Sequence, residues 1–317
     1  MDRIIIGIDI SKKKFDVAYE TSQQKWKQST FDNTIKGFEV FIKWIQETKA
    51  VFVHIVLEAT GRYGEGLANF MYLAGHQVSV INPAQIKNYS RSLLKRAKTD
   101  KVDAQLITEF AQRHELRIWQ PLSPSFQALK DQVRCLESFK KDATQISNRL
   151  GQTVDPIVRQ MLEERLSYIR KQIEKLLLIL KQLVEQDNLL RELAGLLVTI
   201  PGIGDTSALN LLAELPDLET FKCAKQLAAY AGLNPSIRTS GTSVKGRGSL
   251  SRIGHKELRK ILYLPALSLM GRQTALSPFI ERLKERGKKG MVIVCAVMHK
   301  LLHIIFGVLK KRLAFQP

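Results

Sequence analysis

The sequence predicts an α/β domain, then two long helices, then a mainly helical third part. Three patterns carry this prediction. Short apolar runs alternate with helical spacing up to about residue 120, residues 126–193 repeat apolar positions at helical intervals almost without breakers, and a Pro-Gly-Ile-Gly turn follows. We therefore expect domains at residues 1–122, 123–194 and 195–317.

The first domain is predicted to begin with two or three hairpin-like strands, after which helices and strands alternate. The elements expected from apolar patterning are strands at 3–10, 14–19, 28–31, 51–57 and 77–81, and helices at 37–48, 64–74 and between 83 and 113. This order is the one expected of a ribonuclease-H-like fold. The long helices that follow predict a helical hairpin or coiled coil broken near 151–156, whose partner helix belongs either to the same chain or to another subunit.

Four acidic residues mark the candidate active site of the first domain. Asp9 and Glu58 each close an apolar run that predicts a buried strand, and Asp100 and Asp103 share one face of a predicted helix. Carboxylates that meet at a sheet edge repel one another unless cations lie between them. Mg²⁺ suits such oxygen ligands, so the sequence predicts one or two Mg²⁺ ions and two-metal phosphoryl transfer. Taken singly, each acid is better explained as a turn former or helix cap, and only the four together favour metal binding.

The charge predicts a polyanionic partner. The chain has 49 Lys and Arg against 30 Asp and Glu, a formal charge of +19, and residues 236–290 contain 13 of these bases with three acids. Basic side chains on phosphates release condensed counterions, so this concentration favours nucleic acid over a merely solvated surface. Three scattered cysteines and no signal peptide lead us to expect a cytoplasmic protein. The apolar stretch 291–309 is interrupted by His299, Lys300 and His303, which favours a buried helix over a membrane span.

Two segments of the third domain are candidates for nucleic-acid contact. Around Pro201, the glycines Gly202 and Gly204 and the following helix resemble a helix–hairpin–helix, in which backbone N–H groups approach a phosphate; a plain tight turn is the alternative. Residues 236–260 form a loop rich in Ser, Gly and bases, where a hydroxyl could attack a phosphodiester. The side chains expected to hold phosphates are Lys98, Arg238, Lys245, Arg247, Arg252 and Arg259.

Taken together, these blocks resemble the DEDD transposases of bacterial insertion sequences, which are bridge-RNA-guided recombinases. The matching segments, all in order within residues 3–275, are Ile6–Lys12, Leu57–Gly61, Lys98–Ala104, Pro201–Gly204, Tyr230–Pro235, Ser240–Gly241 and Ser251–Gly254. The resemblance implies a RuvC-like domain, a coiled-coil connector and a C-terminal transposase domain.

The resemblance also implies the chemistry. Asp9, Glu58, Asp100 and Asp103 would bind Mg²⁺, and Ser240 would attack DNA to form a covalent intermediate, with Ser251 as the second choice. It further implies donor and target DNA, a structured RNA encoded by the element, and a homo-oligomer, dimeric or tetrameric. The acids and Ser240 lie in different predicted domains, so the site is expected to assemble across a domain or subunit interface.

Three alternatives remain open. A RuvC-like nuclease, such as a junction resolvase, would use water and leave no covalent adduct. An actin-like kinase also opens on a Gly-Ile-Asp strand, but it needs glycines after the Asp, where this chain has Ile10-Ser11-Lys12. A nucleic-acid-binding scaffold without activity would bind without any Mg²⁺-dependent change to the strands.

Overall fold

The computed structural model divides the chain into two compact units, Met1–Pro121 and Leu122–Pro317. It describes residues 3–59, 61–93, 100–236, 239–240, 244–245, 249–250 and 254–316. The predicted boundary near 122 coincides with the division between the units, whereas the predicted boundary at 194 lies inside the second unit. The separation of a connector from a C-terminal domain stays a prediction.

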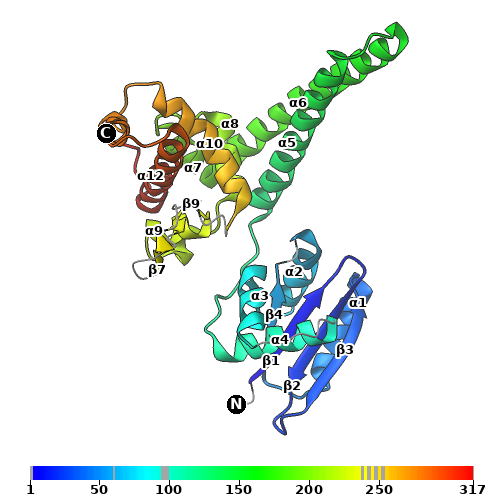
Figure 1. Ribbon diagram of the computed structural model, residues 1–317. Helices are drawn as coiled ribbons and strands as arrows, with labels where there is room; N and C mark the ends of the chain where they lie inside the picture. Colours follow the sequence, from blue (N-terminus) through cyan, green and yellow to red (C-terminus); the bar gives the residue numbers. More distant parts are fainter. Residues whose placement is uncertain are drawn as a thin grey trace. The chain divides into compact units, whose positions relative to one another are not determined.

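The first unit is built on a five-stranded sheet of order β3-β2-β1-β4-β5 (Figure 1). The strands are β1 (Arg3–Ile10), β2 (Lys14–Glu20), β3 (Trp26–Asp32), β4 (Phe52–Glu58) and β5 (Gln77–Ile81). The first three pair antiparallel, while β4 lies parallel to both β1 and β5. This mixed sheet is consistent with the predicted ribonuclease-H-like fold.

Helices cover both faces of this sheet because its central strands are apolar on both sides. On one face, Phe15 and Phe31 pack with Phe41 of α1 (Ile35–Gln46), their ring centroids 5.2–5.5 Å apart. This core also receives Leu67 of α2 (Glu65–Leu73), which follows the 3-10 turn η1 (Gly61–Gly64). On the other face, α3 (Pro83–Ser92) and α4 (Asp100–Arg113) bury a smaller cluster around Val56.

The second unit begins with the two long helices that the sequence predicted. They are α5 (Pro124–Leu150) and α6 (Pro156–Gln186), which lie side by side in Figure 1. Residues 151–155 join them, and the side chains of Ser123 and Asp155 cap their N-termini. A shared cluster of Ile146, Leu166 and Ile169 holds the hairpin together. Supercoiling of the two helices stays a prediction.

The rest of this unit is mainly helical and surrounds one large apolar core. The elements are α7 (Asn188–Val198), α8 (Asp205–Glu214), η2 (Leu218–Thr220), α9 (Ala224–Tyr230), α10 (Lys256–Met270), α11 (Ser277–Glu285) and α12 (Gly290–Lys311). Within the described residues, α12 is the one helix whose length and composition would let it cross a membrane. Half of its apolar stretch is buried in the protein, as predicted for a core helix.

Candidate active site

Asp9 and Glu58 lie side by side at the carboxyl edge of the central strands. Ile8 of β1 is in register with Leu57 of β4, and both side chains are buried in the core on the α1 face. Successive side chains in a strand point to opposite faces, so Asp9 and Glu58 both project toward the face that α4 covers. The two carboxylates therefore follow neighbouring strands on one face of the sheet, and their joint role as metal ligands stays a prediction.

Helix α4, which contains Asp103, packs on the same face of the sheet. The backbone N–H of Gly7 donates to Thr108 Oγ1 at 2.9 Å, and the Thr108 hydroxyl also donates to Ala18 O at 2.8 Å, so α4 crosses β1 and β2 in direct contact. Asp103 stands next to Ala104, whose backbone lies against Gly7. Asp100 is the first residue of α4, but its side chain and the whole of Lys98 lie outside the described residues.

The close approach of α4 depends on the glycine at position 7. A Cβ there would lie 2.5 Å from Ala104 O and from Thr108 Oγ1. We expect Gly7→Ala to lower the free energy of unfolding by about 2 kcal/mol and to lower activity, because the methyl group forces α4 away from β1. Chemical denaturation measures the first effect. Gly66→Ala is the matched control, because its methyl would meet the Phe38 ring at an ordinary 3.9 Å; an equal loss in both variants would contradict the packing argument.

A further acid, Asp16, lies beside Asp9 and was not singled out from the sequence. Asp16 is the antiparallel register partner of Asp9, so the two side chains share a face. Asp16 is 5% exposed, accepts a 2.5 Å hydrogen bond from the Thr30 hydroxyl and pairs with Lys14 at 3.4 Å. Phe15, Val17 and Tyr19 alternate along β2 and pack on the α1 face, so the sequence pattern puts Asp16 on the other face. That Asp9 is its neighbour follows only from the register between β1 and β2.

The donor set at this edge fits a hard divalent cation, because it consists of carboxylate oxygens. Among the side chains that the structure describes, no group of three or more His, Cys, Asp or Glu lies close enough to hold a metal ion. The described side chains include those of Asp9, Glu58 and Asp103 but not that of Asp100. Metal binding by these acids therefore stays a proposal.

In the second unit, Ser240 lies on a β-hairpin rather than on the irregular loop that the sequence suggested. The hairpin pairs β6 (Pro235–Ser236) with β9 (Ser249–Leu250), and β7 (Thr239–Ser240) with β8 (Val244–Lys245). Ser240 pairs with Val244, and this is the described pair farthest from β6 and β9 along the chain. Of the predicted phosphate ligands, Lys245 lies on β8 with its side chain undescribed. Arg238, Arg247, Arg252 and the alternative nucleophile Ser251 lie outside the described residues.

The structure gives Arg259 and the two glycines additional structural roles. Arg259 Nη1 donates to Ala231 O at 2.9 Å, which ties α10 to the end of α9. Gly202 has φ +85° and faces α10, where a Cβ would lie 3.0 Å from Pro265 O. Gly204 is the N-cap of α8, and a Cβ added there would meet no atom within 4 Å. Packing against α10 therefore requires a glycine at position 202 of this turn. The contact of the turn with nucleic acid stays a prediction.

Two family models match this chain, and the first of them extends across the division between the two units. A model of the IS110-type DEDD transposases matches residues 6–158, and one described as the transposase IS116/IS110/IS902 family matches residues 194–281. The pilin gene-inverting protein of Moraxella bovis is 34% identical over 318 residues, covering 99% of this chain and 98% of the relative. The chain belongs to the IS110 family of DEDD transposases.

Other relatives match over nearly the whole chain. The transposase of insertion sequence element IS1111A from Coxiella burnetii is 25% identical over 341 residues, covering 97% of this chain and 90% of the relative. The pilin gene-inverting protein of Moraxella lacunata is 34% identical with the same coverage as its Moraxella bovis counterpart. As a member of this transposase family, the protein is an enzyme that cleaves and rejoins DNA.

Proposed function

We propose that this transposase exchanges DNA strands through a covalent bond between Ser240 and a DNA phosphate, assisted by Mg²⁺ at Asp9, Glu58, Asp100 and Asp103. The observation that carries the proposal is that Asp9 and Glu58 end neighbouring parallel strands on the face covered by α4, the helix that begins at Asp100 and contains Asp103. When bound there, Mg²⁺ would withdraw charge from the scissile phosphate. The position of Ser240 near the tip of a hairpin supports its access to DNA.

The proposed reaction balances without ATP. The Ser240 hydroxyl loses its proton as its oxygen bonds to phosphorus, the scissile P–O bond breaks, and the departing DNA oxygen takes up a proton. The reverse step on a different strand frees the serine and reseals the DNA, so the energy of the phosphodiester is conserved. This chemistry requires the acids and Ser240, from one copy of the chain or from two, to act on the same phosphate.

An RNA encoded by the element is the proposed guide, and a dimer or tetramer is the proposed assembly. The charge of +19 and the 13 bases within residues 236–290 support a large nucleic-acid partner. Lys and Arg side chains at that density can contact many phosphates at once. Donor and target DNA together with RNA would provide those phosphates.

A second candidate function is the inversion of a chromosomal DNA segment. It is favoured by the 34% identity to pilin gene-inverting proteins over 98% of their length, against 25% to the IS1111A transposase. Both functions use the same cleavage and rejoining steps. They differ in the DNA substrate, because inversion requires two oppositely oriented copies of the recombination site flanking one segment.

The experiment that tests the proposal uses the DNA on both sides of this gene. Purified protein is incubated with end-labelled flanking DNA, RNA transcribed from the flanks, and either Mg²⁺ or EDTA, and then run on a denaturing gel. We expect a labelled protein–DNA adduct that requires Mg²⁺. Cut DNA without an adduct would support water as the nucleophile and a RuvC-like nuclease, and binding without cleavage would support an inactive scaffold.

A further inference from the structure

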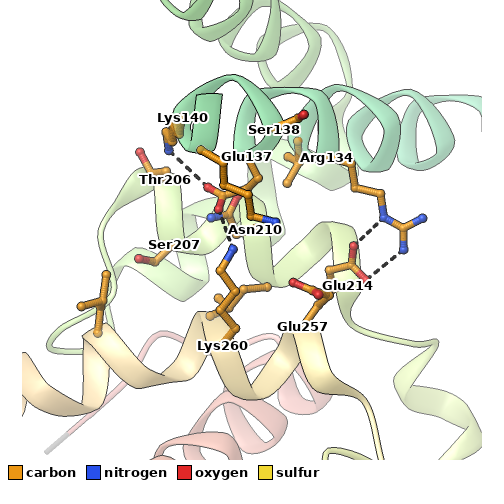
Figure 2. A pocket seen from close by; sticks show the side chains of 14 residues that line it. Arg134, Glu137, Ser138, Lys140, Thr206, Ser207, Asn210, Glu214, Glu257 and Lys260 are labelled. Atoms are coloured by element: carbon orange, nitrogen blue, oxygen red, sulfur yellow. Dashed lines mark hydrogen bonds and ion pairs between the residues drawn. The ribbon is translucent and has the colours of Figure 1, made fainter. Parts of the chain in front are cut away.

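A buried carboxylate, Glu214, lies where three helices of the second unit meet. Glu214 ends α8 and is 8% exposed, and its carboxylate accepts two hydrogen bonds from the Arg134 guanidinium on α5, at 2.8 and 3.2 Å (Figure 2). His255 Nε2 approaches the same carboxylate at 3.4 Å. Arg134 and Glu214 also line a cavity of about 770 Å³ between α5, α8 and α10. Removing Arg134 would leave the buried Glu214 carboxylate without both of these guanidinium donors.

The position of the proton on the His255 ring decides which ring nitrogen can donate to Glu214. His255 Nδ1 accepts the backbone N–H of Leu258 at 3.3 Å and so caps α10. Burial lowers the pKa of His255, although Glu214 partly opposes this, so the ring is neutral near pH 7. A neutral ring that accepts at Nδ1 carries its proton on Nε2. That proton faces Glu214, which therefore fixes the orientation of the ring.

His255 in turn joins the N-terminus of α10 to the end of α9, the two helices that precede and follow the hairpin in the sequence. Its backbone N–H donates to Tyr230 O at 2.8 Å, and its ring stacks on the Tyr230 ring with centroids 5.6 Å apart. Gly254 has φ +148°, and a Cβ there would lie 2.4 Å from Tyr230 O and 2.6 Å from Gly232 N. Gly232, shortly before β6, and Gly254, the first described residue after β9, therefore meet in one tightly packed junction.

We propose that Glu214 is a positioning residue for Ser240. Glu214 joins α5 and α8 to His255 and so fixes the base of the hairpin on whose second strand pair Ser240 lies. Attack on a phosphate requires the oxygen within about 3–3.5 Å of phosphorus, and a misplacement of about 1 Å can cost about 100-fold in rate. This inference rests on the proposed serine chemistry.

The test measures the rate constant and the amplitude of adduct formation at saturating RNA, DNA and Mg²⁺. For Glu214→Gln we expect the rate constant to fall roughly 10- to 100-fold, with the amplitude and the half-saturating DNA concentration within about twofold of wild type. A merely structural role would reduce the folded fraction, and hence the amplitude, at an unchanged rate constant. An unchanged rate constant therefore overturns the proposal.

Glu137→Gln is the matched control, because Glu137 lines the same cavity and pairs with Lys140 at 3.4 Å and Lys260 at 3.0 Å without contacting the hairpin base (Figure 2). We expect it to keep the wild-type rate constant; an equal fall in both variants would overturn a specific role for Glu214.

A second variant covers the case in which Glu214→Gln does not fold. His255→Asn keeps a side-chain acceptor for the N-terminus of α10 but removes the contact with Glu214, while the Arg134–Glu214 pair stays intact. We expect a fall in rate constant of at least about tenfold, and a wild-type value would overturn the proposal. An adduct that survives Ser240→Ala contradicts the proposed function instead, so the two failures can be told apart.

Discussion

Replacing Ser240 with alanine is expected to abolish the covalent protein–DNA adduct. Loss of a nucleophilic hydroxyl removes the atom that bonds to phosphorus, so we expect adduct formation to fall on the order of 10³-fold or more, below detection on a denaturing gel. RNA and DNA binding, measured by gel shift, should stay within about threefold of wild type, because the bases on the hairpin and α10 are unchanged.

Two other serines make this result specific. Ser249 lies on β9 of the same hairpin, opposite Ser236, and Ser249→Ala is expected to keep forming adducts. Ser251 is the alternative nucleophile from the family resemblance. An adduct that persists in Ser240→Ala and disappears in Ser251→Ala would move the nucleophile to Ser251. Adducts in all three variants would contradict attack by any of these serines.

Much of the first unit could be predicted from sequence because its central strands are buried on both faces. The runs at Ile4–Ile8 and Val53–Leu57 are apolar apart from His54, and each is followed by an acid, so both the strands and the positions of Asp9 and Glu58 follow from local pattern. The place of Asp16 does not follow, because it depends on the Asp9–Asp16 register between two strands. Register is set by pairing that a single strand does not encode.

Less of the second unit could be predicted from sequence, because more of it depends on contacts between distant segments. The hairpin that carries Ser240 consists of two-residue strands among Ser, Gly and basic residues, which locally resemble a loop. What fixes its base is long-range: Glu214, His255 and Tyr230 come from three helices or their caps. Likewise, Gly202 was expected to face a phosphate, whereas its close contact with Pro265 depends on how α10 packs. Side-chain packing between distant segments determines these features.

The second large effect is expected for Asp9→Asn. The amide keeps the size of the carboxylate but removes the negative charge beside Glu58, and a neutral ligand holds Mg²⁺ less firmly. We expect strand exchange to slow on the order of 100-fold or more, because a bound metal contributes several kcal/mol to the stabilisation of transition-state charge. Nucleic-acid binding should remain measurable, since the basic residues are untouched.

Metal dependence separates this variant from a general loss of structure. If Asp9 is a ligand, raising Mg²⁺ should partly restore the Asp9→Asn rate, because mass action refills a weakened site, but it should restore nothing in Ser240→Ala. Glu20→Gln is the matched control. Glu20 lies on the same face of β2 but at the far end from Asp16, where it accepts a 3.2 Å hydrogen bond from Gln112. A wild-type rate in Asp9→Asn, or an equal loss in Glu20→Gln, would contradict metal binding at Asp9.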